Sequence, residues 1–342
     1  MTLSAVRIRS SVALVVGLAA ALALAVSPAN AGPGGGPLAA DPEGGTATLR
    51  AQLEAASKGY TDAVARLDAS KARGAQLADK MKATEAEYAR VMERVGVLAA
   101  TAYKGGRVGG IAALLDSDSP AGMFERAMTL NSQAKLDDVQ LRRAKDTKGA
   151  LTSQQKALAD EIQVQQAQLG EMAKRKQAAE QALAPVGGSV KTNGPTGGSA
   201  TASAVQRRAD GTLASEGCTV DDPTTSGCIS PRMLHALQQA KAAGFTHFVS
   251  CFRSQEDGGE HPRGRACDFA AAPNGFGGVA TGADKDYGNR LAAYFLANSK
   301  NLGVLYVIWF NQIWLPSSGW RAYHGGGDPS SNHTNHVHLS VQ

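Results

Sequence analysis

The stretch Glu260-His-Pro-Arg-Gly-Arg-Ala-Cys-Asp-Phe269 carries a histidine and an aspartate seven residues apart, and His333-Thr-Asn-His-Val-His338 adds three histidines near the C-terminus. Successive side chains of a strand alternate between its faces, so His336 and His338 are predicted to point the same way. All seven histidines of the chain follow residue 234. This clustering favours a common site over separate surface histidines.

His261, Asp268 and His338 together offer two imidazoles and one carboxylate. A catalytic zinc ion typically has three protein ligands, and its fourth position is left for water. The spacing therefore predicts one Zn²⁺ ion held by these three residues.

With these residues the chain resembles the zinc D-Ala-D-Ala carboxypeptidase and Hedgehog-type peptidase superfamily. The resemblance is carried by His261-x-x-Gly-x-Ala-x-Asp268 and His336-x-His338, and it covers residues 218–342 only. The segment Val249-Ser-Cys-Phe-Arg253 is similar to a strand of that superfamily that ends in Ser-x-x-Arg.

The resemblance implies roles for three further residues. Arg253 matches the substrate or oxyanion position, and His336 matches a histidine that supports the metal or transfers protons. Many members carry a carboxylate base before the last zinc ligand, but Asn332, Thr334 and Asn335 stand there in this chain. A subset has His-x-x-His-x-His instead, so the resemblance points to His333 as the catalytic histidine.

Two interpretations remain open at this point. The resemblance implies an exported zinc peptidase, of D,D-carboxypeptidase or endopeptidase type, that acts on peptidoglycan stem peptides or cross-links. The missing carboxylate base favours the alternative, a non-catalytic zinc-bearing module that binds or scaffolds in the cell envelope. The formal net charge of +5 is small and mixed, so nucleic acid is not an expected partner.

Residues 1–31 are predicted to be a signal peptide. Arg7 and Arg9 precede an apolar run, Val12–Val26, and Ala29-Asn-Ala31 ends it with a small-residue cleavage site. The run is shorter than the roughly 20 residues that a membrane-spanning helix needs. We therefore expect a secreted, wall-associated protein with no membrane span after cleavage, and a flexible segment over residues 32–45.

The four cysteines fit export, because an even number in a small extracytoplasmic domain indicates disulfides. Cys218–Cys228 would close a local loop, and Cys251–Cys267 would join the strand before the site to the strand that carries Asp268. Cysteine ligation of zinc is the alternative, although the chain has no Cys-x-x-Cys spacing.

Residues 46–184 are predicted to form an antiparallel coiled-coil hairpin. Apolar residues at heptad spacing indicate one helix over 46–102 and a second over 121–184, joined by a Gly-rich break at 104–110. In the first helix the seam residues are Leu49, Leu53, Tyr60, Leu67, Leu77, Met81, Tyr88, Val91, Val95 and Leu98. In the second they include Met123, Leu130, Leu141, Leu151, Leu158, Ile162, Leu169, Met172 and Leu183. The arm would be a spacer or a contact for a cell-envelope protein.

Residues 185–212 are rich in Gly, Ser, Thr and Ala, which predicts a flexible linker that keeps the arm and the C-terminal domain independent. Residues 213–342 are expected to form the zinc domain. Predicted helices over 230–243 and 284–299, together with strands over 246–252, 265–271, 304–310, 312–315 and 336–341, indicate an α+β domain with an antiparallel sheet. Trp320 and Tyr323, in a loop that leads to His333, are candidates for lining a cleft.

Overall fold

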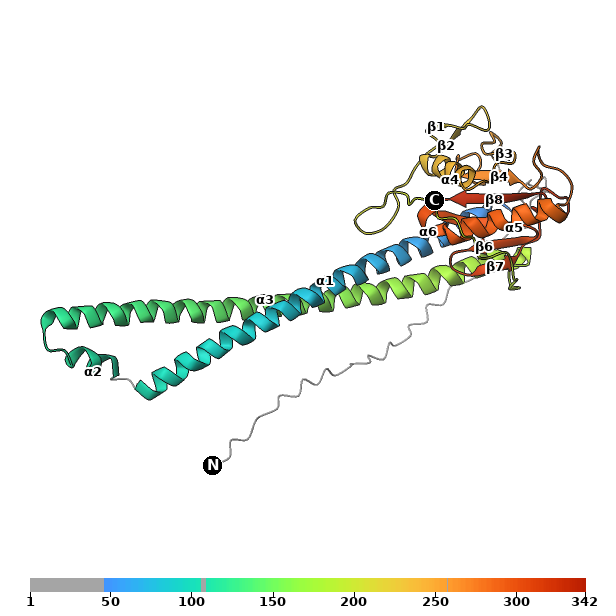
Figure 1. The fold of residues 1–342 in the computed structure, drawn as a ribbon. Coiled ribbons are helices and arrows are strands. Elements are labelled where there is room, and N and C mark those ends of the chain that lie inside the picture. Colours follow the sequence, from blue (N-terminus) through green and yellow to red (C-terminus); the bar gives the residue numbers. More distant parts are fainter. Residues whose placement is uncertain (1–45, 106–108, 257) are drawn as a thin grey trace. The chain divides into compact units, whose positions relative to one another are not determined.

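The computed structural model describes residues 46–105, 109–256 and 258–342, and it has the predicted α+β class (Figure 1). The predicted signal peptide and the predicted flexible segment 32–45 lie outside the described residues. Among the residues described, no helix combines the length and apolarity that a membrane crossing requires.

The helical arm consists of α1 (Ala47–Gly105), the short α2 (Gly109–Leu115) and α3 (Pro120–Leu183). Ser119 begins α3, since its hydroxyl accepts a hydrogen bond from Gly122 N at 3.2 Å. The two long helices are antiparallel: Gly59 lies against Arg175, and Arg73 forms an ion pair with Glu161. The predicted hairpin is therefore confirmed.

The seam of α3 differs from the prediction. Leu141, Ile162 and Leu169 are 51%, 45% and 54% exposed. The side chain that faces α1 is the one before Ile162, because Glu161 pairs with Arg73 and its carbonyl accepts from Ser70 Oγ. Small residues on α1 let the two helices lie close together. Polar side chains of α3 therefore fill the interface, where the heptad pattern predicts leucines.

The C-terminal domain is built on a six-stranded antiparallel sheet of order β3-β4-β8-β5-β6-β7. Its strands are β3 (Val249–Ser250), β4 (Ala266–Ala270), β5 (Val304–Ile308), β6 (Gln312–Leu315), β7 (Gly319–Ala322) and β8 (His336–Val341). A separate hairpin pairs β1 (Val220–Asp221) with β2 (Cys228–Ile229). The sequence predicted neither this hairpin nor β7.

One face of the sheet packs against helices α4 (Pro231–Ala242) and α5 (Gly282–Ala297), and the short helix α6 (Ser299–Leu302) follows α5. Ser230 caps α4, since its hydroxyl accepts from Met233 N at 3.1 Å. Cys267 and Phe269 of β4 and Val337 and Leu339 of β8 join this core. Because side chains alternate along a strand, the residues between them face the other way.

The base of the arm packs against the sheet. Leu49, Leu53 and Leu183 form an apolar cluster with residues of β5 and β6, among them Leu305 and Ile313. Ser57 Oγ donates to the carbonyl of Leu305. The arm and the domain are therefore in contact, and the expectation of two independent parts is wrong. The amphipathic pattern of α1 predicts an apolar face. It does not predict that the first turns of this face pack against the sheet as well as against α3.

The predicted flexible linker is also packed. It begins with a 3-10 turn, Ala184–Val186, and continues without helix or strand along the domain. Thr192 N donates to the carbonyl of Trp320 at 3.2 Å, and Ala202 N donates to Asn298 Oδ1 at 2.8 Å. Trp320 is buried in β7, not in a cleft-lining loop. The glycines of this segment allow its backbone to lie close against the domain, whereas their abundance predicts flexibility.

Both predicted disulfides are present. Cys218–Cys228 braces the β1–β2 hairpin, and Cys251–Cys267 joins the segment after β3 to β4. The Cα–Cα distances are 5.2 and 3.9 Å. No described cysteine is free for metal. Such bridges are typical of proteins in oxidising compartments outside the cytosol.

Candidate metal centre

The pairing of β4 with β8 brings the predicted ligands together. Asp268 lies directly opposite His338 in this ladder, and Ala270 lies opposite His336. These residues point away from the helix-covered face, on the alternate positions to Cys267 and Leu339. His261 comes from the turn before β4, which closes through Gly264 N donating to the His261 carbonyl at 3.0 Å. Gly264 has φ +66°, a conformation that favours glycine.

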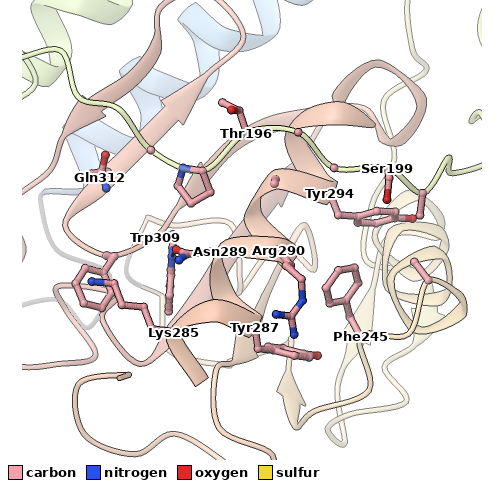
Figure 2. A pocket seen from close by; sticks show the side chains of 18 of the residues that line it. Thr196, Ser199, Phe245, Lys285, Tyr287, Asn289, Arg290, Tyr294, Trp309 and Gln312 are labelled. Carbon is pink, nitrogen blue, oxygen red and sulfur yellow. Dashed lines mark hydrogen bonds between the residues drawn. The ribbon is translucent and has the colours of Figure 1, made fainter. Parts of the chain in front are cut away.

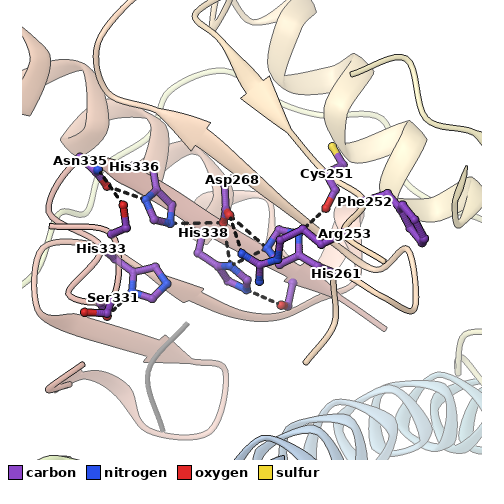
Figure 3. A network of polar contacts seen from close by, with 12 residues as sticks. Cys251, Phe252, Arg253, His261, Asp268, Ser331, His333, Asn335, His336 and His338 are labelled. Atoms are coloured by element: carbon purple, nitrogen blue, oxygen red, sulfur yellow. Dashed lines mark hydrogen bonds and ion pairs between the residues drawn. The ribbon is translucent and has the colours of Figure 1, made fainter. Parts of the chain in front are cut away.

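Three potential ligand atoms converge in a buried space (Figure 3). His261 Nε2 is 3.2 Å from Asp268 Oδ2 and 3.3 Å from His338 Nδ1, and His338 Nδ1 is 2.9 Å from Asp268 Oδ1. Two nitrogen or oxygen ligands bound tetrahedrally to one zinc ion lie about 3.3–3.4 Å apart, given bonds of about 2.0–2.1 Å. Two of the three separations are close to this value and the third, 2.9 Å, is shorter, so the three side chains are grouped closely enough for a single zinc-sized cation.

Hydrogen bonds behind the imidazoles fix which nitrogens face the site. The Cys251 carbonyl can only accept, so His261 Nδ1 carries the proton and Nε2 keeps its lone pair. His338 Nε2 lies 2.8 Å from Ser340 Oγ, and when it donates there Nδ1 is likewise a lone pair. In this tautomer two imidazole lone pairs and a carboxylate face one another, and a bound cation would satisfy all three.

The electrostatics of the cluster agree with metal binding. Burial lowers the pKa of His338 to about 4, although Asp268 opposes this effect. Burial alone would raise the pKa of the Asp268 carboxyl, but the neighbouring His261 and His336 outweigh it and hold that pKa well below its usual range. At neutral pH His338 is therefore neutral and Asp268 is ionised, as metal ligands must be.

His336 bridges Asp268 and Asn335. Its Nε2 is 3.3 Å from Asp268 Oδ1, and its Nδ1 is 2.7 Å from Asn335 Oδ1. The Asn335 amide is oriented by its own donation from Nδ2 to the Gly277 carbonyl at 2.8 Å. His336 therefore orients the carboxylate of Asp268 and is not one of the three grouped ligands.

His333 has two unusual features. Its backbone is left-handed, with φ +53°, which is uncommon for a histidine. Its Nδ1 lies 3.1 Å from the Ser331 carbonyl, and its buried Nε2 has no hydrogen-bond partner among the described residues. Burial, followed by the charges of His336 and His338, holds the His333 pKa well below its usual value. His333 therefore presents Nε2 as a neutral acceptor beside the grouped residues.

Arg253 lies at the edge of the same cluster. Its Nη1 is 3.8 Å from Asp268 Oδ2, and its side chain is partly exposed. The Cys251–Cys267 disulfide fixes the segment that carries it. The structure thus brings all six predicted site residues into one network (Figure 3).

Other contributors were not predicted. Ser340 could have been found from the sequence, because it is two residues beyond His338 and shares its strand face. The Cys251 carbonyl and the Tyr306 ring, stacked 5.6 Å from the His338 ring, gave no sequence signal. Their positions depend on neighbouring strands that only the fold brings together.

A charged cluster supports the turn that carries His261. Arg265 Nη2 lies 2.6 Å from Glu260 Oε2 and 2.6 Å from Glu54 Oε1 of helix α1. Arg263 pairs with the other oxygen of Glu54. Burial raises the pKa of Glu260 to about 7, against the opposing effect of Arg265. The arm thus supplies a carboxylate that balances two arginines beside the site.

Asp222 anchors the segment before Arg253 from the β1–β2 hairpin. Its buried carboxylate accepts from Thr224 N at 2.8 Å, Thr225 Oγ1 at 2.6 Å and Phe252 N at 2.9 Å. Burial alone would raise the pKa of this carboxyl, but these hydrogen bonds outweigh it and lower the pKa.

We therefore predict that Asp222→Asn lowers the free energy of unfolding by roughly 1.5–3 kcal/mol at pH 7, as expected for lost bonds to a charged acceptor. A depressed folded-state pKa stabilises the protein above the unfolded value of about 4, and this stabilisation is lost as pH falls through the folded pKa. Denaturant unfolding of both proteins at pH 7 and pH 3 tests this. An equal difference at both pH values would contradict the assignment.

The fold and the site together define a buried group of two histidines and one carboxylate on an antiparallel sheet, which is a candidate metal site. The model of a protein family described as the VldE C-terminal domain matches residues 225–334, a range that includes Arg253, His261, Asp268 and His333 and ends before His336. Neither the search of curated proteins nor that of solved structures returned a match.

Proposed function

We propose that this chain is an exported zinc-dependent peptidase that cleaves peptidoglycan stem peptides or cross-links. The observation that carries the proposal is the convergence of His261 Nε2, His338 Nδ1 and the Asp268 carboxylate at separations of 2.9–3.3 Å. The donor set suits Zn²⁺, which prefers imidazole and carboxylate ligands in sites of this size. When bound, zinc would acidify a water molecule and polarise a substrate carbonyl.

The surrounding residues supply the rest of a hydrolytic site. The guanidinium of Arg253 lies at the exposed edge of the cluster, where it can hold negative charge that develops on a carbonyl oxygen. His333 Nε2 faces the site without a partner among the described residues, so it can exchange a proton with the leaving amine. His336 keeps the Asp268 carboxylate in place through its 3.3 Å contact. The helical arm would hold this domain at the wall, in contact with an envelope protein.

The second candidate is a non-catalytic zinc module of an envelope scaffold. It is favoured by the side chains around His333: Thr334 Oγ1 bonds to the Pro329 carbonyl, Asn335 is bound to His336, and no acidic residue follows Asp328 in the sequence. The two functions differ in whether His333 can replace a carboxylate as the proton carrier.

Digestion of purified peptidoglycan by the full mature chain, with product analysis by mass spectrometry, separates them. We expect soluble fragments that end at one type of peptide bond. We expect no release by the Asp268→Asn protein, because asparagine has nearly the size of aspartate but lacks its carboxylate. Zinc-loaded protein that leaves every tested cross-link type intact would exclude the peptidase and leave the binding module.

A further inference from the structure

A second cavity lies beside α5, on the face of the sheet opposite the metal centre. It has a volume of about 840 Å³, and its walls are the segment 193–200, residues 243–245, one side of α5 and the β5–β6 turn (Figure 2). Pockets of this size accommodate ligands of several rings. None of the metal-centre residues lines it.

The outer wall of the cavity is held at two points by glycines. A Cβ on Gly194 would lie 2.4 Å from the Trp320 ring, and one on Gly198 would lie 2.6 Å from the Ala293 carbonyl. Trp320 Nε1 also donates to the Pro195 carbonyl at 3.0 Å. The backbone therefore crosses the domain at fixed places, and the residues between them form a stable rim over the cavity.

The cavity is positively charged. Lys285 and Arg290 line it, and its lining contains no aspartate or glutamate. In the described part of the chain, neither cation forms an ion pair with a carboxylate. Lys285 Nζ instead lies 3.7 Å above the centre of the Phe310 ring. Two cations that form no ion pair among the described residues, in a groove whose lining has no carboxylate, favour an anionic ligand.

The remaining lining combines aromatic rings with neutral hydrogen-bonding groups. Arg290 lies beside the rings of Tyr287 and Phe245 (Figure 2). Asn289 Oδ1 accepts from Trp309 Nε1 at 2.9 Å, so the Asn289 amide donors remain for a ligand. Thr196 and Ser199 add hydroxyl groups from the rim. This lining matches a sugar that carries an acid group. The aromatic rings can cover the apolar face of the sugar, the amide can bond to its hydroxyls, and the cations can pair with its carboxylate.

We propose that this groove binds an acidic sugar chain, in which hexose units carry free carboxylates. On the proposed function, that chain is the glycan strand of the wall in stretches without stem peptides, where the lactyl carboxylates are free. The groove would then hold the polymer while the metal centre acts on its peptides. The β5–β6 turn joins the two places, since Phe310 N donates to the His333 carbonyl at 2.9 Å.

The test is calorimetric titration of the full mature chain with glycan strands whose stem peptides have been removed enzymatically. Such strands contain no peptide bond to cleave, so binding is independent of hydrolysis. We expect Lys285→Gln/Arg290→Gln to weaken binding at least about tenfold, the loss of one to two charge-assisted contacts. Arg208→Gln/Lys241→Gln is the control, because it removes equal charge from exposed positions outside the cavity.

A second comparison uses the same strands after their carboxylates have been reduced to alcohols, which should bind at least about tenfold more weakly, for the same reason. Unchanged binding in the cavity double variant, equal weakening in the control, equal binding of reduced strands, or preference for free stem peptides would each overturn the proposal. If the strands bind but no wall type is digested, the groove stands and the peptidase fails. Digestion without strand binding gives the reverse result.

Discussion

Replacing His261 and His338 together by alanine is expected to reduce the zinc content of the purified chain from about one ion to less than about a tenth of an ion. The two imidazoles supply two of the three converging ligand groups, through nitrogens that lie 3.3 Å apart. The double substitution removes both nitrogens. A lone Asp268 carboxylate would remain, and one carboxylate does not hold zinc against competing water and buffer. Metal analysis after dialysis measures the change.

The control for this experiment is His235→Ala, which removes a histidine whose Nε2 bonds to the Ser203 carbonyl outside the cluster. It should retain its zinc. Near-ultraviolet circular dichroism establishes whether the double variant is folded, and Asp268→Asn offers a second, nearly isosteric loss of one ligand. Zinc retained in the folded double variant would place the metal elsewhere and remove the basis of the proposed function.

The alternation rule and the spacing of two motifs predicted the three side chains that the structure groups together. His336 and His338 had to share a strand face, and the β4–β8 register then put Asp268 directly opposite His338. The disulfides were predictable for a similar reason, because an even number of cysteines and their local spacing left few pairings.

The contacts that the sequence did not indicate are non-local. Glu54 is more than 200 residues from Arg263 and Arg265, and nothing in a heptad pattern identifies it as their partner. Gly194 and Gly198 belong to a segment whose composition predicts a flexible linker. Because they have no side chains, the backbone lies against Trp320 and α5 instead. The left-handed backbone of His333 was hidden for the same reason, since it is set by contacts with the β5–β6 turn.

Replacing His333 by asparagine is expected to lower peptidase turnover by roughly 10²–10⁴, the usual contribution of a general acid or base. The buried Nε2 of His333 faces the site without a partner in the described chain, and asparagine cannot exchange a proton there. Asparagine is the appropriate substitute because it tolerates the left-handed backbone at φ +53°, so strain does not confuse the result.

The zinc content of the His333→Asn protein should equal that of the wild type, because His333 is not among the three grouped ligand residues. His336→Gln is the matched variant: it can keep a donor toward Asp268 while losing the imidazole, so a larger loss in His333→Asn assigns proton transfer to His333. The measurement is the release rate of one defined peptide fragment under saturating peptidoglycan. Full activity in both variants would exclude the histidines from proton transfer, and the proton carrier would then have to come from another residue at the edge of the site.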